Sequence, residues 1–570
     1  MTRKPHRNKP APQTLAMPHG LLLVKICALL FSVLAVYWPD LHGGPLWDDG
    51  LLIFANPLLR NAQGLFDIWF SAKPTDYFPV TLSLLWAGWH LWGAHAVAYH
   101  LLNVALHCLN ALLVWRVLWR LKLPGAYWAA LLFSLHPICV FSVAWLSELK
   151  NTISMLFALL CMDAFVLWLD QQRRSAYLRS LLFYSLAVLS KTSVVMLPFG
   201  LLALLWWRRD KLDSKALLAS LPYFALSLGS GILTIWFQLI RLTENVGYRP
   251  EPMLSRIAAA GMAIWFYFWK LLIPIHLIMV YPRWQIDERA ILNYMPLLFL
   301  IIIFIALFII RHKDGKALAC FISFLILPMA PILGLVNMAY HRYSLVANHF
   351  IYLCVPVFAC ILVMLIFRYL TKYSEALVLS LALIYALLAF SRAHAFSSEE
   401  RLWRDTIAQN SRAWVAYGNL AYLKAVNGKP DEALPLFSAA IDIYNNDSEL
   451  YRNRGNANFE TGHLQEAMQD YSRSIQLKPQ APRAYLDRAL LLLQLNRPAE
   501  SEHDFNNYVL LSRNPVEGYA QRAQVYAQLR RPREALRDAQ RAAQLGWPAP
   551  PQFIQQLQTM AKIDSSKVLP

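Results

Sequence analysis

The sequence predicts an all-α protein in two parts: a polytopic membrane helix bundle of about eleven helices, then an α-solenoid of paired helices. The composition is the first observation, because 57% of the 570 residues are hydrophobic and only 15% are charged, as in membrane proteins. The second is a series of long apolar segments before residue 394. The third is a 34-residue period that starts soon afterwards, as in helical repeats.

The apolar segments have the lengths that membrane helices need. The first begins after a basic tail, 1–19, and runs into Tyr37-Trp38-Pro39-Asp40, so we expect an uncleaved anchor rather than a signal peptide. The predicted helices lie near 20–38, 95–118, 126–145, 150–169, 176–190, 193–207, 216–240, 291–311, 316–337, 346–369 and 374–393. Segment 253–280 is also apolar, but Pro274 and Pro282 interrupt it. We expect an interfacial or re-entrant hairpin there.

Short clusters of Lys and Arg between the apolar segments predict the orientation of the bundle. The net charge of +18 comes mainly from these clusters, because residues 411–545 hold 17 basic and 15 acidic side chains. This distribution favours a membrane protein over a nucleic-acid binder. We expect a multi-pass protein, of the bacterial inner-membrane type, with a cytoplasmic N-terminus. The first loop, 39–94, and everything after 394 then face the periplasm or an equivalent lumen.

The cysteines give no sign of a disulfide framework or a metal site. All seven lie in or beside apolar segments, without the Cys and His spacing of metal ligands.

Regular spacing marks the polar C-terminal part. After a linker, 394–410, about four repeats are expected over 411–548, followed by a tail, 549–570. Two sets of residues recur every 34 positions: Tyr417, Tyr451, Tyr485 and Tyr519, and Glu432, Glu466, Glu500 and Glu534. This pattern resembles tetratricopeptide repeats, which imply a concave groove for a peptide or a partner helix. The alternative is a spacer or an oligomerisation arm without a ligand.

Asp48 and Asp49 are the main candidates for a functional role among the polar residues of the external first loop. The plain interpretation is a turn or a helix N-cap, where Asp is common. The functional interpretation is a general base that takes the proton of an acceptor hydroxyl as it attacks a sugar. Because adjacent side chains point in different directions, one Asp would be catalytic and the other orienting.

The second predicted helix carries four polar residues on one face, spaced by three, four and three: His100, Asn103, His107 and Asn110. One interpretation is a polar seam between helices. The other gives the face a functional role, with His100 nearest the outer end and able to reach a site.

Three external positions could serve an anionic ligand. Lys191 lies at an outer joint, where a lysine opposes the usual charge bias and could hold a lipid phosphate. Arg342 and His349 flank another outer loop and could help it. The alternative for Lys191 is an interfacial lysine that snorkels to the membrane surface. Glu148 and Lys150, which lie nearby in the sequence of another external loop, could simply pair with each other.

A set of short motifs in order resembles one family. The motifs are Trp47-Asp48-Asp49, Asn56-Pro57, Tyr77-Phe78-Pro79, Tyr99-His100-Leu101-Leu102-Asn103, His136-Pro137, Trp145 with Glu148, Leu189-Ser190-Lys191, Tyr281-Pro282, Asn348-His349 and Leu402-Trp403-Arg404-Asp405. They resemble the transmembrane and tetratricopeptide-repeat O-mannosyltransferases and similar bacterial proteins. These belong to the GT-C-type glycosyltransferases, which use polyprenyl-phosphate sugars.

The resemblance implies a role for each candidate residue. Asp48 and Asp49 would supply the base, and Lys191 with Arg342 would hold the donor phosphate. The residues that would line the site are His100, Asn103, Glu148, Tyr281 and His349. The donor is a lipid-linked sugar and the acceptor a protein hydroxyl, whereas the sequence supports no cofactor and no metal.

Three positions depart from the family. Phe141 stands where an acid is common, Leu149 where an arginine is common, and Asn348 where an acid is common. These departures leave two other functions open. One is an inactive membrane scaffold whose repeats recruit envelope proteins, and the other is a ligase or polymerase of lipid-linked oligosaccharides.

Overall fold

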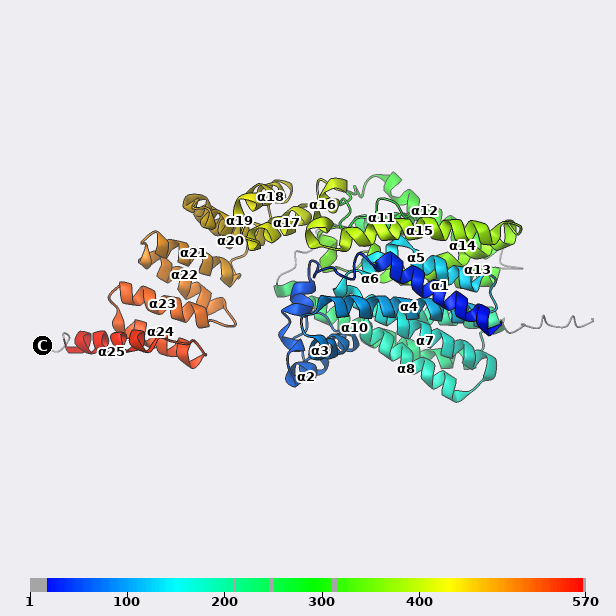
Figure 1. Cartoon of the computed structure of the whole chain (residues 1–570), viewed down its shortest axis with the longest axis horizontal. Coiled ribbons are helices and arrows are strands. Elements are labelled where there is room, and N and C mark those ends of the chain that lie inside the picture. The colour runs from blue at the N-terminus through cyan, green and yellow to red at the C-terminus, as the bar shows by residue number, and fades with distance from the viewer. Residues whose placement is uncertain (1–17, 210–211, 245–250, 310–314, 567–570) are drawn as a thin grey trace, which may run out of the picture. The chain divides into compact units, whose positions relative to one another are not determined.

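The computed structural model describes residues 18–209, 212–244, 251–309 and 315–566, and all regular elements among them are helical (Figure 1). Most of the basic tail, 1–19, and the last four residues lie outside this part. The chain divides into two compact units between Leu402 and Trp403. We describe each unit by itself.

The first unit contains fifteen α-helices in the described residues. They are α1 (His19–Tyr37), α2 (Ala62–Phe70), α3 (Pro79–Trp92), α4 (Ala96–Arg120), α5 (Ala126–Leu135), α6 (Val140–Val143), α7 (Leu149–Gln171), α8 (Arg174–Ser190), α9 (Leu197–Arg209), α10 (Ser214–Glu244), α11 (Met253–Leu272), α12 (Met295–Ile309), α13 (Gly315–Ile326), α14 (Val355–Tyr369) and α15 (Ser374–Phe396). Each of the eleven predicted segments is helical over most of its length.

Seven helical segments in the described part are long and apolar enough to cross a membrane. They are His19–Tyr37, Ala96–Arg120, Leu146–Gln171, Ser214–Gln238, Gly315–Ile332, Asn348–Tyr369 and Ser374–Phe396. An eighth results if the bent pair of α5 and the following helix, Pro137–Val143, counts as one span. The remaining predicted spans correspond to α8, α9 and α12, which are shorter.

Two predicted elements differ in the structure. Segment 126–145 is not one helix, because the chain bends by 50° after α5. The bend follows from Pro137, which has no N–H to donate and forces His136 into an extended conformation. Segment 253–280 was expected to be a hairpin, but it forms the single helix α11 and then an irregular segment from Ile273.

The polar face of α4 is largely a seam between helices. The Asn103 amide donates to the carbonyls of Ser142 (3.1 Å) and Val143 (2.8 Å). His107 bonds Tyr352 and the carbonyl of Ser134, and Asn110 donates to the carbonyl of Thr152. Since these groups are buried, each bond satisfies a polar atom that would otherwise be costly. The seam therefore positions the chain around 142–152, which leads into the site.

The first loop folds onto one end of the first unit. It contains helices α2 and α3, and Asn61 caps α2 by accepting the N–H of Gly64 (2.8 Å). Apolar residues of the loop, such as Ile53, pack with Leu146 and Leu149 in one buried cluster. The turn between α7 and α8 lies at the opposite end of this unit (Figure 1).

The boundary between the units falls within α16 (Glu399–Gln409), which lies in the expected linker, and the second unit continues with four antiparallel helix pairs and a final helix. The pairs are α17 (Trp414–Val426) with α18 (Pro430–Ile443), α19 (Ser448–Glu460) with α20 (Leu464–Leu477), α21 (Pro482–Gln494) with α22 (Pro498–Leu511), and α23 (Val516–Gln528) with α24 (Pro532–Gln544). Helix α25 (Pro551–Ser566) packs against α24. The turns of the first two pairs need φ values of +72° and +83°, which Gly428 and Gly462 supply.

A repeated arginine joins neighbouring pairs of the solenoid. Arg488 on α21 donates two hydrogen bonds to the buried Asp504 on α22 (2.7 and 2.8 Å) and one to Ser472 on the preceding α20 (3.1 Å). The same arrangement occurs one period earlier and one period later: Arg454 with Asp470 and Ser438, and Arg522 with Asp538 and Asn506. Each arginine thus links three helices of two successive pairs.

Replacing the central arginine should loosen the solenoid. In Arg488→Ala, the carboxylate of Asp504, which is only 2% exposed, loses its partner. We expect a local destabilisation of about 2 kcal/mol, because a buried charged group is left unsatisfied. Hydrogen exchange of α21 and α22 in the full chain measures it. The matched control is Arg483→Ala, which breaks an exposed pair with Glu517 and should cost less than about 1 kcal/mol. Equal exchange rates in both variants would show that the repeated arginine does not hold neighbouring helix pairs together.

Candidate active site

The two aspartates lie in a strained and tightly packed part of the first loop. Trp47 has a φ of +44°, a left-handed conformation that costs energy for a residue with a side chain. The indole of Trp47 stacks on that of Trp145, with ring centroids 5.5 Å apart, and the edge of Tyr343 contacts it. A π-helical turn, Gly50–Phe54, follows directly. Strained residues and π-helical turns are both common at functional sites.

Asp49 anchors the loop to the rest of the bundle. Its carboxylate is fully buried, and its two oxygens accept the N–H groups of Leu46 (2.9 Å) and Ser147 (2.7 Å). Burial, together with the neighbouring charge of Asp48, raises the pKa of Asp49 to about 8. Because both oxygens are engaged with backbone groups, Asp49 is suited to orienting the loop rather than to moving a proton.

Asp48 has the geometry of a base. It is only partly buried, and its Oδ1 accepts hydrogen bonds from Trp145 Nε1 (3.0 Å) and Ser147 Oγ (2.8 Å). Both bonds go to the same oxygen, and within the described residues Oδ2 has no hydrogen bond. Burial raises the pKa of Asp48, while the charge of Lys150 lowers it in part. A carboxylate with one fixed and one open oxygen can accept a proton in a defined direction.

A buried cluster of opposite charges lies beside Asp48. Glu148, 3% exposed, accepts Lys150 Nζ on Oε1 (2.9 Å) and Lys191 Nζ on Oε2 (3.1 Å). Lys191 also donates to Asn151 Oδ1 (2.6 Å). The expected pair of Glu148 and Lys150 therefore forms, and Lys191 contacts the same carboxylate. The Glu148 carboxylate thus has two lysines as partners, and the charges of Asp48 and Asp76 also act on this cluster.

Aromatic rings border this cluster. The ring of His349 meets those of Trp145 and Tyr340 edge to face, each with centroids 5.3 Å apart, and its carbonyl accepts Asn151 Nδ2. Arg342 lies over Tyr343, with its guanidinium 6.0 Å from the ring centroid. The described contacts of Arg342 connect it, through Tyr343, to the Trp47 side of the site.

Three predicted lining residues have other positions. His100 was expected to reach the site, but it is fully buried, with Nδ1 3.1 Å from Asp40 Oδ2 and not aligned for a hydrogen bond. Asn103 is likewise enclosed in the seam of α4, because its amide bonds neighbouring carbonyls. Tyr281 is buried and donates to Asn348 Oδ1 (3.0 Å). All three side chains are buried, and His100 lies close enough to Asp49 to lower the pKa of that carboxyl group.

At the three positions that depart from the resembled family, the side chains are buried among neighbours of the first unit. The ring of Phe141 meets Phe396 edge to face with centroids 5.0 Å apart, and Leu149 is buried in the apolar cluster of the first loop. Asn348 accepts Tyr281 and donates to the carbonyl of Ile278. No group of three or more His, Cys, Asp and Glu side chains in the described part of the chain is arranged to hold a metal ion.

Sequence reasoning missed the residues that hold the aspartates. Trp145 and Ser147 lie almost a hundred positions away in the chain, and Asp40 is the partner of His100. The only sequence signal was the compact motif around Trp145 and Glu148, whose polar residues follow a helix-breaking Pro137. Asn151, which links Lys191 to the 349 segment, follows the same motif.

Comparison with known proteins identifies part of the second unit. Residues 455–496 match the tetratricopeptide repeat family model, so the prediction of such repeats is confirmed there. No curated protein matches the chain. Three solved structures are similar: MamA from Desulfovibrio magneticus RS-1 (20% identity, 27% of this chain and 85% of that one, TM-score 0.25), YrrB, a repeat protein with an unusual peptide-binding site (16%, 31% and 87%, 0.25), and PilF from Pseudomonas aeruginosa (16%, 35% and 95%, 0.27).

Proposed function

We propose that the first unit is a membrane glycosyltransferase that moves one sugar from a polyprenyl-phosphate carrier to an acceptor hydroxyl on the outer face. The observation that carries this proposal is the position of Asp48, whose Oδ1 is fixed by Trp145 and Ser147 while Oδ2 is open. The buried cluster with Lys150 and Lys191 lies beside it. A base next to a cationic phosphate site is what this reaction requires.

The residues would act in one displacement step. Asp48 takes the proton of the acceptor hydroxyl, and the oxygen forms a bond to the anomeric carbon. The bond between that carbon and the phosphate oxygen breaks, and the lipid phosphate leaves with the electron pair. Lys191, with Lys150 beside it, stabilises the negative charge of the leaving phosphate. Attack opposite the leaving group inverts the anomeric centre.

The topology supports an outer-face site. The turn between α7 and α8 follows Gln171 and contains Arg173, and it lies opposite α2 and α3 within the unit (Figure 1). Because basic loops favour the cytoplasm, the first loop would face the periplasm or lumen. The tetratricopeptide repeats would present the acceptor protein on that side, since such repeats form concave surfaces that bind extended segments.

The test is the mass of the product. The purified protein in lipid nanodiscs is given polyprenyl-phosphate hexose and Ser- and Thr-containing peptides from envelope proteins. We expect one added hexose per modified hydroxyl, with release of polyprenyl phosphate. A transferred oligosaccharide would instead indicate a ligase, and an unmodified peptide pool would contradict the transferase.

The second candidate function is a membrane-anchored scaffold. The apolar packing of Phe141 and Leu149 favours it, because charged residues of the family are replaced there. A scaffold requires that partner capture depends on the repeats and survives the loss of Asp48. Crosslinking in cells that carry either Asp48→Asn or a chain lacking the repeats separates the two functions.

A further inference from the structure

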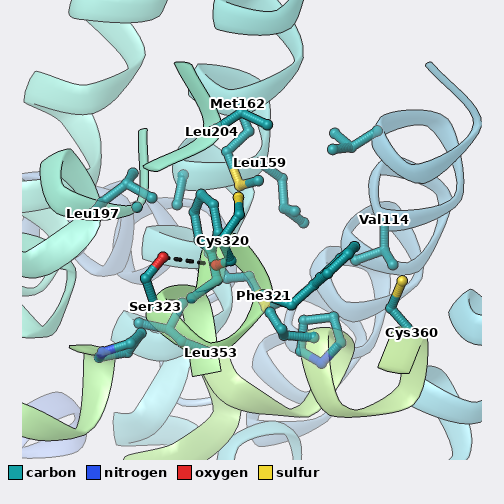
Figure 2. Close-up of a pocket in the computed structure, with 18 of the residues that line it drawn as sticks. Val114, Leu159, Met162, Leu197, Leu204, Cys320, Phe321, Ser323, Leu353 and Cys360 are labelled. Atoms are coloured by element: carbon teal, nitrogen blue, oxygen red, sulfur yellow. Dashed lines mark hydrogen bonds between the residues drawn. The ribbon is translucent and has the colours of Figure 1, made fainter. Parts of the chain in front are cut away.

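The last helix pair of the solenoid, α23 with α24 (Figure 1), carries a polar recess of about 430 Å³. The rings of Tyr519 and Tyr526 on α23 border it, together with charged side chains of α24. The cleft between α4, α7, α9, α13 and α14 of the first unit is different in kind, because side chains such as Leu159, Leu204 and Phe321 make it apolar (Figure 2). A ligand of the recess on the last pair must therefore be polar.

Four exposed arginines on this pair form what we call the arginine row: Arg530, Arg533, Arg537 and Arg541. The last three are spaced by four residues, so they follow one face of α24. Arg537 and Arg541 also border the recess. All four are Arg and none is Lys, and a flat guanidinium can bind a carboxylate through two parallel N–H groups. The arginine row thus has the chemistry of a carboxylate-binding surface.

The repeat fold does not require this row, because the three earlier pairs lack it. At the position of Arg537 they carry residues without a permanent charge: Pro435, Gln469 and His503. At the position of Arg533 they carry no basic residue: Asp431, Gln465 and Ala499. Over one period, residues 516–549 contain six basic and three acidic side chains, whereas 448–481 and 482–515 contain four of each, and 414–447 contain two basic and four acidic ones. The positive charge is a feature of the last pair alone.

The acids of the last pair are already engaged elsewhere. Asp538 accepts two hydrogen bonds from Arg522 (2.6 and 3.0 Å), and Glu534 accepts two from Arg531. The third acid, Glu517, forms its ion pair with the preceding helix pair. Other arginines therefore offset these carboxylates, and the arginine row is left without acidic partners of its own.

The contacts of the row agree with this. Within the described residues Arg537 forms no salt bridge, and Arg541 donates to an uncharged group, Gln544 Oε1 (3.2 Å). An uncompensated row of like charges attracts anions over a distance that salt shortens. The recess beside it offers the space for a side chain that follows a carboxylate in the same ligand.

We propose that the last helix pair binds an acidic segment of a partner protein, with carboxylates on Arg537 and Arg541 and a neighbouring side chain in the recess. A peptide is favoured over a lipid surface for two reasons. Repeats of this kind form extended surfaces that bind proteins, and a flat bilayer would meet the row but leave the recess unused. The inference concerns the second unit alone and does not depend on sugar transfer.

The test measures binding of a fluorescent peptide of alternating Glu and Ala by the full chain in phosphatidylcholine nanodiscs, using fluorescence anisotropy. Arg537→Gln combined with Arg541→Gln should weaken binding about tenfold, the joint effect of losing two exposed charge pairs. Because both side chains are exposed, the melting temperature should stay the same. A peptide with Gln in place of Glu should bind neither protein. Equal affinity of the wild type and this variant for the Glu peptide would overturn the proposal.

The matched control is Arg473→Gln. Arg473 is the equivalent of Arg541 two pairs earlier, and it donates to Gln476 as Arg541 donates to Gln544. The substitution removes the same charge from the same local setting, but in a pair without the row, so affinity should not change. If it weakens the peptide as much as Arg541→Gln does, the net charge of the protein attracts acids generally and the proposal is wrong.

A charge exchange tests the site without relying on a loss of binding. Arg537→Glu combined with Arg541→Glu should release the Glu peptide and bind a peptide of alternating Lys and Ala. An unchanged preference for the Glu peptide would contradict the assignment.

Nanodiscs that contain phosphatidylglycerol test the membrane as the alternative partner. The tenfold ratio between the wild type and the double Gln variant should persist in them. If anionic lipid abolishes this ratio, the arginine row binds the membrane surface and the proposal is wrong. Because the assay contains no sugar donor, row-dependent peptide binding without any sugar transfer would refute the transferase alone.

Discussion

Asp48→Asn is expected to lower sugar transfer by about 10² to 10⁴-fold, the usual contribution of a positioned general base, while the protein remains folded. An amide has nearly the same shape and can keep the hydrogen bonds from Trp145 and Ser147 through its oxygen. It cannot take the acceptor proton. Initial rates of hexose transfer in nanodiscs, together with the melting temperature, measure both parts of the prediction.

Asp49→Asn is the matched control for this substitution. Both oxygens of Asp49 accept backbone N–H groups, and an asparagine presents an NH₂ group where one oxygen was. This variant should therefore lose thermal stability as well as activity. If Asp48→Asn retains full transfer, or if only Asp49→Asn loses it in a stable protein, the assignment of the base to Asp48 is wrong.

The pH profile gives a second view of the same base. Burial raises the pKa of Asp48 above its ordinary value of 3.8, and Lys150 opposes this shift. Because the base must be unprotonated, kcat/KM should fall as the pH decreases through that raised pKa. In Lys150→Met the opposing charge is absent, so the acid limb should move to higher pH. If the acid limb of the pH profile stays at the same pH in Lys150→Met, the charge of Lys150 does not influence the pKa of the base.

Glu148→Gln is expected to destabilise the first unit by about 3 to 5 kcal/mol, the usual cost of breaking a buried ion pair by removing one partner. The change leaves Lys150 and Lys191 facing a neutral amide in a site where the carboxylate was 3% exposed. The measurement is the melting temperature in detergent, with chemical denaturation as a check.

Two further variants control this result. Glu148→Gln combined with Lys191→Met removes one of the stranded charges and should recover part of the stability. Asp170→Asn breaks the more exposed pair between Asp170 of α7 and Arg208 of α9 and should cost less than about 1 kcal/mol. A loss in Glu148→Gln no larger than in Asp170→Asn would show that the cluster contributes little to folding.

Periodic features of the chain were predictable because they depend on local geometry. The recurrence of tyrosine every 34 residues from Tyr417 is a property of each helix pair, and the family match over 455–496 confirms a tetratricopeptide repeat in that part of the chain. Helical segments followed from apolar lengths, although the bend at Pro137 was not foreseen. The transferase activity itself stays a prediction, since it came from motif order and not from a relative.

The candidate site was predictable only in part, because its partners come from distant segments. Sequence order indicated Asp48 and Asp49 but could not distinguish them; the distinction depends on Trp145 and Ser147. His100 was expected to reach the site from the outer end of its helix, yet it is buried with its Nδ1 3.1 Å from Asp40 Oδ2. Spacing along one helix shows which residues share a face, but not whether that face meets a cavity or another helix.

The bond from Asn151 to the carbonyl of His349 joins positions 198 apart in the chain. During synthesis, the segment with Glu148 therefore leaves the ribosome roughly 10 to 40 s before its last partner, at 5 to 20 residues per second. Over that interval Glu148, Lys150 and Lys191 are all already in the nascent chain, and the Asn151 amide still lacks the carbonyl of His349.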